Sequence, residues 1–375
     1  MKKLICLIFV FAAGILNASE LKFMASETLG YDDNIYLTNG NKVGSAISST
    51  KIGALYNLAI PYSSLEGKFS IVGGYNAFQK HNNKNGFWDT LGVADFGNEN
   101  FKIGNIFLLT SDPANSELTE RKQRINNNIY ASYRTGIYDK LNFGFKISDE
   151  INKYTSGGVI KYLDRNRFNI GMGVYYNISE KTNLLAEYTF TALTYQNNHD
   201  SNSTGGVFAL GIEGKLSPKI EGEAKLTYNY RNYKHDIAGY KNNADVLGYD
   251  LSVAWKPTTQ NVLRLSGTRN FEETIYDNNR YFISTGIKLY GSQKILEKFT
   301  AALTLAYENL SYNTANSAGI KRSDDVYTVR PEVNYQFKDW LSAGVWYQYR
   351  KRASNAGSDI HYLNNRAGAF IKAVF

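Results

Sequence analysis

The sequence predicts an all-β protein, a transmembrane antiparallel β-barrel of about 18 strands. Three observations indicate this fold. After residue 20, apolar and polar residues alternate along nearly the whole chain, commonly in runs of ten to fourteen residues. Aromatic residues make up 14% of the chain, with 29 Tyr and 20 Phe, and these residue types favour strands. The last ten residues form one more alternating run, which ends in Phe375.

Residues 1–19 are interpreted as a signal peptide that is removed. Two lysines precede an apolar stretch, Leu4–Leu16, and a small-residue cleavage region follows at Asn17–Ser19. The single cysteine, Cys6, lies in this leader, which excludes a disulfide-stapled fold. No later run of about 18 apolar residues exists, which excludes a helical membrane protein. We therefore expect an exported chain whose barrel comprises residues 20–375.

The length of the alternating runs distinguishes a membrane barrel from a soluble sheet. Residues 220–231 alternate apolar with polar side chains, and residues 327–337 and 141–150 repeat the arrangement. A soluble β-sandwich typically uses strands of about five or six residues, whereas a tilted strand needs about nine to eleven to cross a bilayer. We therefore expect apolar side chains toward lipid and polar ones toward the lumen. The sheet must close, because an open edge would leave unpaired backbone groups in hydrocarbon.

Connections alternate between short and long along the chain. Short turns are predicted near residues 60–62, 98–100, 138–140, 179–182, 217–219, 257–260, 291–296 and 338–339. Longer polar stretches lie near 32–43, 81–86, 111–121, 154–163, 197–203, 236–243, 276–279, 313–323 and 353–360. Short periplasmic turns and longer outer loops are typical of such barrels. Because 276–279 is the weakest loop and 86–108 the least regular strand pair, 16 strands is the alternative count. A barrel of this size leaves an aqueous lumen, and we expect no separate plug domain.

The final strand predicts how the barrel is assembled. Phe375, Ala373 and Ile371 share one apolar face of residues 366–375. An alternating last strand with a terminal Phe resembles the signal that bacterial assembly machinery recognises on outer-membrane barrels. We therefore expect location in the bacterial outer membrane, with its lipids and the barrel-assembly machinery as partners.

Two segments carry a resemblance to a known family. Thr28–Asn39 reads Thr-Leu-Gly-Tyr-Asp-Asp-Asn-Ile-Tyr-Leu-Thr-Asn, and Thr110–Arg121 reads Thr-Ser-Asp-Pro-Ala-Asn-Ser-Glu-Leu-Thr-Glu-Arg before Arg124 and a tyrosine-rich strand. Both resemble the outer-membrane β-barrel porins of the "porin 2" type, a family often associated with exopolysaccharide biosynthesis clusters. The resemblance is motif-like over the first 150 residues and only patterned over the rest. It implies a transport role and supplies no catalytic residues.

The sequence offers no constellation of catalytic or metal-binding residues. His81, His199, His235 and His361 all map to predicted outer loops or their strand ends, where each is more simply a solvated residue than a metal ligand. Neither a Gly-x-Ser-x-Gly elbow nor a His-Glu-x-x-His motif is present. We expect no enzymatic activity, no metal and no cofactor.

Charged residues predicted on the lumen side bear on which solutes pass. They number thirteen positive against nine negative. Either they form an ion-pair network that stiffens the wall, or they make a mildly basic pore that concentrates anions. In the C-terminal third, the arginines lie on strands where only Glu308 and Glu332 supply inward carboxylates, which predicts a positive stripe and weak anion selectivity. The predicted pore-lining residues are Arg264, Arg280, Lys288, Arg330, Arg350, Glu332 and Trp346, the last offering a stacking surface for sugar rings.

These observations predict an outer-membrane channel for the passive passage of hydrophilic, anionic or saccharide solutes. A non-enzymatic component of exopolysaccharide export or assembly, or a surface structural protein, is the alternative. Charges spread along every inner strand face argue against a nucleic-acid partner. The sequence leaves open the choice between monomer and trimer.

Overall fold

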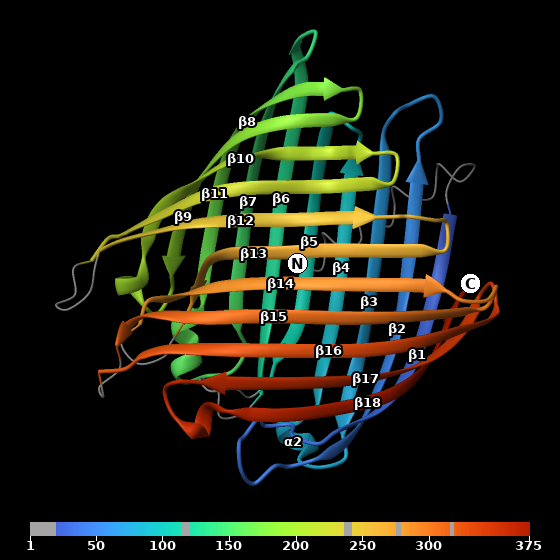
Figure 1. Cartoon of the computed structure of the whole chain (residues 1–375), viewed down its shortest axis with the longest axis vertical. Coiled ribbons are helices and arrows are strands. Elements are labelled where there is room, and N and C mark those ends of the chain that lie inside the picture. The colour runs from blue at the N-terminus through green and yellow to red at the C-terminus, as the bar shows by residue number, and fades with distance from the viewer. Residues whose placement is uncertain (1–19, 114–120, 236–241, 275–278, 316–318) are drawn as a thin grey trace, which may run out of the picture.

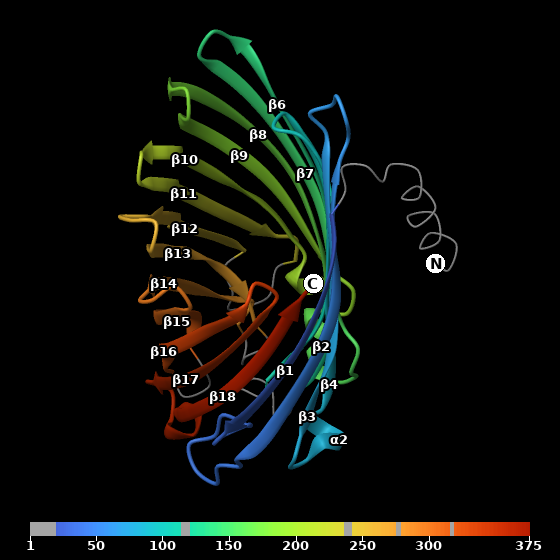
Figure 2. The same cartoon turned by 90° about the vertical axis from the view of Figure 1, so that its right-hand side faces the viewer.

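The protein forms one closed sheet. The computed structural model describes residues 20–113, 121–235, 242–274, 279–315 and 319–375, so the predicted signal peptide lies outside the described residues. Strand β1 (Glu20–Asp32) pairs with β2 (Ser45–Ala59) on one side and with β18 (Tyr362–Val374) on the other. The sheet therefore has no free terminal strand, and its 18 antiparallel strands surround a lumen (Figures 1 and 2).

Each strand pairs with its neighbours in the sequence, as in an up-and-down barrel. The predicted fold class and the count of 18 strands are confirmed. Between β2 and β18 lie β3 (Glu66–Phe78), β4 (Phe87–Gly97), β5 (Phe101–Asp112), β6 (Lys122–Tyr138), β7 (Leu141–Tyr154), β8 (Arg165–Ser179), β9 (Thr182–Tyr195) and β10 (Ser203–Ser217). They are followed by β11 (Ile220–Tyr233), β12 (Asn243–Trp255), β13 (Asn261–Glu273), β14 (Tyr281–Lys294), β15 (Phe299–Ala315), β16 (Lys321–Lys338) and β17 (Leu341–Ser354).

Short and long connections separate the barrel into two ends. One end carries short turns, such as residues 139–140 and 180–181, and also both ends of the barrel chain. The other carries the long connections, which hold the short helices α2 (Asn82–Asn85), η2 (Val159–Leu163), η3 (His199–Ser201) and η4 (Ser358–Ile360). No helix in the described part of the chain is long and apolar enough to cross a membrane. We call these the short-turn end and the long-loop end.

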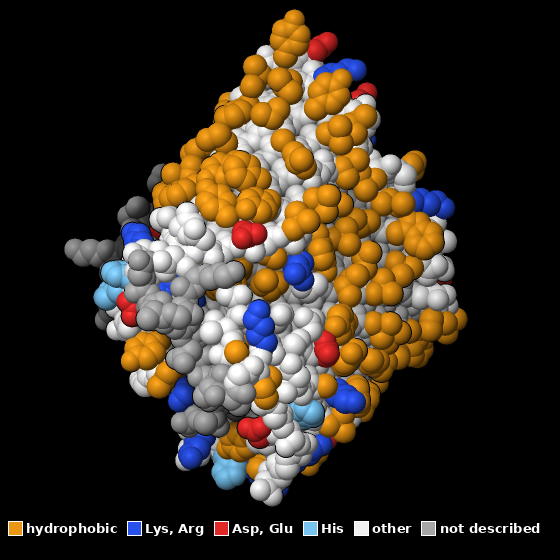
Figure 3. Space-filling model, turned by 60° about the vertical axis from the view of Figure 1, so that its left-hand side comes forward, with side chains coloured by type: hydrophobic (Ala, Val, Ile, Leu, Met, Phe, Trp, Pro, Cys, Tyr) orange, Lys and Arg blue, Asp and Glu red, His pale blue; other side chains and the backbone are white. Residues whose placement is uncertain are grey.

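The outer face of the barrel is apolar and the inner face is polar. Leu226 of β11 is 68% exposed, and it stands on the outer face opposite Leu210 of β10, which is as exposed. Apolar side chains cover much of the outer surface in the same way (Figure 3). The alternate residues of β11, such as Lys225 and Thr227, point inward. This is the reverse of a soluble protein and is the arrangement that a bilayer stabilises.

The chain end completes the barrel wall. Phe375 donates from its backbone nitrogen to the carbonyl of Phe23 at 2.9 Å, and the Phe23 nitrogen donates to the Phe375 carbonyl at 2.6 Å. The two rings lie 6.3 Å apart. Ala373 and Ile371 share the outer face of β18, opposite Ala25 and Glu27 of β1.

One pair of strands departs from the regular ladder. β12 pairs with β13 only over residues 250–255 and 263–268. β13 continues to Glu273 and stays paired with β14 down to Tyr281. The long-loop end of the β13–β14 hairpin therefore leaves β12, and Figure 1 shows β13 bending away from it. We call residues 269–273 with 281–285 the inward segment, because their contacts lie inside the barrel.

We predict that an arginine is costly on the outer face and harmless on the inner face. Leu226→Arg should lower the free energy of unfolding by about 2–4 kcal/mol, because it places a charge near the middle of the bilayer. Ser252→Arg, on the exposed inner face of the adjacent β12, should change it by less than about 0.5 kcal/mol. Urea unfolding in lipid vesicles measures both. Equal costs would show that the two faces are wrongly assigned.

Candidate functional site

The inward segment packs against the inner side of the barrel wall. Phe271 and Tyr281 form a buried cluster with Tyr233 of β11 and with Ala244 and Val246 of β12. The Phe271 and Tyr281 rings meet edge to face, with centroids 4.9 Å apart. By strand alternation, Phe271 would face lipid. It instead fills part of the lumen, so the lumen is narrowed by the wall itself and not by a separate plug domain.

A buried carboxylate holds the inward segment in place. Glu273, whose side chain is 3% exposed, lies 3.2 Å from Arg165, 3.3 Å from Arg167 and 3.4 Å from Arg231. Arg165 and Arg167 belong to β8, which is separated from β13 by four strands along the wall. Glu273 can reach them only across the inside of the barrel.

The break in the ladder between β12 and β13 avoids a contact between two like charges. Continuing its register from the Asp250–Thr268 pair would place Glu273 opposite Asp245. Two carboxylates directly opposite each other on adjacent strands repel. Because β13 bends inward instead, Glu273 contacts three guanidinium groups, which neutralise its buried charge.

The crossing point of the two strands requires a glycine. A Cβ atom on Gly248 of β12 would lie 2.1 Å from the carbonyl oxygen of Arg269, so β13 passes directly beneath it. Side chains hydrogen-bond to backbone carbonyls beside the broken ladder. Arg269 donates from Nε to the Leu247 carbonyl at 3.2 Å, and the Tyr249 hydroxyl donates to the Gly286 carbonyl at 3.1 Å.

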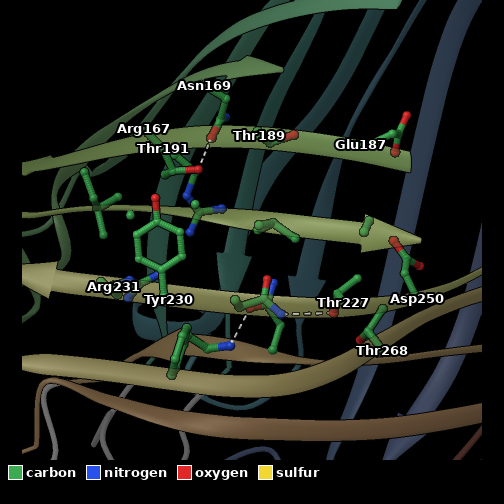
Figure 4. A pocket seen from close by; sticks show the side chains of 18 of the residues that line it. Arg167, Asn169, Glu187, Thr189, Thr191, Thr227, Tyr230, Arg231, Asp250 and Thr268 are labelled. Atoms are coloured by element: carbon green, nitrogen blue, oxygen red, sulfur yellow. Dashed lines mark hydrogen bonds between the residues drawn. The ribbon is translucent and has the colours of Figure 1, made fainter. Parts of the chain in front are cut away.

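A cavity of about 390 Å³ lies between β13 and the inner wall. Figure 4 shows its labelled side chains arriving from several consecutive strands. The lining includes a set of hydroxyl and amide side chains, namely Ser148 of β7, Asn169 of β8, Thr189 and Thr191 of β9, Thr227 and Asn229 of β11, and Thr268 and Asn270 of β13. We call this the central cavity. The hydroxyl and amide groups of this lining can exchange hydrogen bonds with a polar solute, and charged side chains such as Arg167, Glu187 and Asp250 line the cavity beside them.

Most charged groups near the central cavity are paired. Lys225 lies 2.8 Å from Glu187 and 2.9 Å from Glu223, and Lys146 also contacts Glu187 at 2.8 Å. Arg167 lies 3.5 Å from Glu150 as well as close to Glu273. Here the charges form a network across the wall, as one of the two sequence interpretations predicts.

Two of the predicted pore-lining cations stand apart from such networks. Arg264 of β13 and Lys288 of β14 lie on exposed inner-face positions and line a second cavity with Tyr290. Within the described residues neither forms an ion pair. Arg264 lies over the Tyr290 ring at 5.8 Å. Both positions lie closer to the short-turn end of the barrel than the central cavity does.

Arg330, Glu332 and Trp346 form a compact group on β16 and β17. Arg330 pairs with Glu332 at 3.0 Å and lies over the Trp346 ring at 4.5 Å. Arg366 approaches the same ring at 5.8 Å. The indole is thus occupied by two guanidinium groups, and the charge of Arg330 is balanced.

Arg350 lies over the Tyr362 ring at 5.8 Å and forms no ion pair within the described residues. Arg280 differs from the expectation that it lies on a strand. It precedes β14, is 8% exposed, donates to the His235 carbonyl at 2.7 Å and lies over Tyr233 at 4.7 Å. The inward turn of the hairpin buries it, so it lines no open wall.

The expectation that only Glu308 and Glu332 supply inward carboxylates in the C-terminal third is wrong. Asp324 of β16 is fully buried and pairs with Arg322 at 2.7 Å and with Arg352. Glu273 is a further inward carboxylate. Asp324 shares the inner face of β16 with Arg330 but borders the loop predicted at 313–323, and Glu273 reverses the face that alternation predicts.

The histidines lie in or beside the long connections, as expected. Among the described residues, no group of three His, Cys, Asp or Glu side chains is placed to hold a metal ion.

The comparison with protein families shows which family the chain belongs to. The model of the family described as "Putative beta-barrel porin 2" matches residues 123–373, which is more than half of the chain. The chain belongs to this porin family. The matched range begins after the two motif segments at residues 28–39 and 110–121. It therefore covers mainly the part of the chain where the resemblance is only patterned.

Solved outer-membrane porins share the fold of this porin. A BenF-like porin from Pseudomonas fluorescens is 10% identical with a TM-score of 0.53, covering 96% of this chain and 100% of its own. OccK2 (OpdF) of Pseudomonas aeruginosa is 10% identical with a TM-score of 0.52, covering 96% and 99%. OccAB3 of Acinetobacter baumannii is 8% identical with a TM-score of 0.51, covering 96% and 100%. At these identities the likeness establishes the fold alone. No curated protein matches the chain by sequence.

We predict that Glu273→Gln releases the inward segment of this porin. Three guanidinium groups would lose their buried counter-ion, which should cost about 3–5 kcal/mol of stability. Single-channel recordings should then show a larger or more variable conductance than the parent protein. Glu272→Gln removes the neighbouring, exposed carboxylate and is the matched control. Unchanged stability and conductance in Glu273→Gln would mean that the cluster does not hold the segment.

Proposed function

We propose that this outer-membrane porin is a passive channel for hydrophilic solutes with a weak preference for anions. The supporting observation is the closed barrel with a polar inner face and two lumen cavities, one beside the inward segment and one nearer the short-turn end. A water-filled lumen of this kind lets polar solutes cross hydrocarbon without leaving a polar environment. Transport of this kind needs no chemical step, in keeping with the porin family.

The anion preference is supported by Arg264 and Lys288. They lie on adjacent strands, with Lys288 opposite Ser266 and two residues from Tyr290, the partner of Arg264. Their charges are exposed to the lumen and unpaired within the described residues, and a low-dielectric wall focuses the field of such charges. Arg330 contributes less, because Glu332 balances it.

Ion selectivity in planar bilayers tests this proposal. We expect the parent protein to conduct and to give an anion-selective reversal potential in a salt gradient. The double variant Arg264→Gln with Lys288→Gln should shift that potential toward cations, because it removes two unpaired lumen charges. Arg330→Gln is the control and should shift it less. A refolded protein without conductance would exclude the channel, whereas cation selectivity of the parent would exclude only the anion preference.

We also propose that the outer face of β18 guides assembly of the barrel. Phe375→Ala should reduce the amount of heat-modifiable, folded barrel in the outer membrane, because it removes the terminal ring that contacts Phe23. Phe370→Ala, an aromatic residue on the inner face of the same strand, is the matched control. Equal folding yields for both variants would remove the terminal Phe from the assembly signal.

A further inference from the structure

We propose that the central cavity binds an uncharged sugar ring during passage. The proposal rests on the channel function above and specifies the solute class that its narrow part favours. The binding site would be a trough, with a floor on β10 and one polar side on each neighbouring strand.

The floor of the trough is made of small, mainly apolar residues. Gly205, Val207 and Ala209 of β10 face the lumen and line the central cavity. A larger side chain at these positions would fill the space. The cavity of about 390 Å³ lies within the range of about 300–1,000 Å³ for small-molecule sites.

Hydroxyl and amide groups form the two sides. Val207 lies between Thr189 of β9 and Asn229 of β11, its partners in the two ladders. Ala209 is likewise flanked by Thr227 of β11. β9 and β11 are two strand spacings apart, about 9.5 Å. A pyranose ring fits this arrangement, because its C–H face can rest on Val207 and Ala209 while its hydroxyl groups reach the polar sides.

Several polar groups are held in fixed orientation and others are free. Thr191 donates to Asn169 at 2.8 Å, and Asn169 donates to Ser148 at 3.0 Å. In contrast, the hydroxyl groups of Thr189 and Thr268 form no hydrogen bond within the described residues. The fixed groups shape the site, and the free groups are available to a solute at little conformational cost.

The inward segment completes the trough. Thr268 and Asn270 of β13 both line the cavity. Thr268 is the last β13 residue paired with β12, whereas Asn270 occupies its place because β13 leaves β12 beyond residue 268. The site therefore depends on the same turn that narrows the lumen.

The local charge balance favours an uncharged sugar over an acidic one. Of the four cations that line the cavity, Lys225, Arg167 and Arg231 are paired with carboxylates. The fourth, Arg269, donates to the Leu247 carbonyl and to the Thr285 hydroxyl. Asp250 and Glu272 also line the cavity, and neither forms an ion pair within the described residues. Both side chains can accept hydrogen bonds from sugar hydroxyl groups, and the negative charge of Asp250 would repel a sugar carboxylate.

Sugar-induced current block in planar bilayers tests the proposal, with maltotriose as the neutral probe and glucuronate as the charged one. Maltotriose should reduce the current of the parent protein in a saturable manner, and glucuronate should block more weakly. The isosteric double variant Thr189→Val with Thr268→Val should weaken the maltotriose block about tenfold, because two hydrogen bonds are lost. The open-channel conductance should remain.

A second pair of variants separates the trough from the rest of the lumen. Ala209→Leu fills the floor and should abolish the block, whereas Ala302→Leu, on the inner face of β15, should not affect it. Conductance without maltotriose block would overturn the sugar site and leave the channel standing. Block that is unchanged in the threonine variant, or stronger with glucuronate, would also overturn it. Should the protein not conduct, saturable maltotriose binding by calorimetry would support the site and its absence would overturn it.

Discussion

The structure depends on the requirement that backbone polar groups in a bilayer be paired within the protein. With no water in the hydrocarbon layer, an open strand edge is too costly, so β1 must meet β18 and the sheet must close. Closure separates an outer face for apolar side chains from an inner face for polar ones. It also limits where the ladder can be broken. At the break between β12 and β13, side chains of Arg269 and Tyr249 bond to backbone carbonyls.

That break gives the barrel its functional geometry. A regular barrel of 18 strands has a lumen wider than side chains can fill. Here the wall supplies its own constriction, since the end of the β13–β14 hairpin lies against the inner face of β11 and β12. The apolar contact of Phe271 and the ion pairs of Glu273 act together, so the segment is held by packing and by charge. A porin can thus narrow its lumen without a separate plug domain.

Paired and unpaired charged side chains lie in different parts of the lumen. Around the central cavity, most cations are paired with carboxylates, and hydroxyl and amide groups lie between them. Toward the short-turn end, Arg264 and Lys288 remain unpaired within the described residues. On the proposals above, the first region would bind hydrogen-bonding solutes and the second would concentrate anions. A solute that crosses the lumen would therefore meet a hydrogen-bonding region and a region of unpaired cations one after the other.

The sequence by itself determined the barrel and the approximate positions of the connections, because alternation and turn residues act locally along each strand. The structure decided the count of 18 strands over the alternative of 16. The sequence also indicated which residues of β11 face inward. It could not show that Glu273 and Phe271 reverse their expected faces, since that depends on Asp245 across the ladder and on Arg165 five strands away. Likewise, the pairing of Arg330 and the hollow above Val207 follow from strand register. Only the tertiary structure decides such contacts, because they join residues that are distant in the chain.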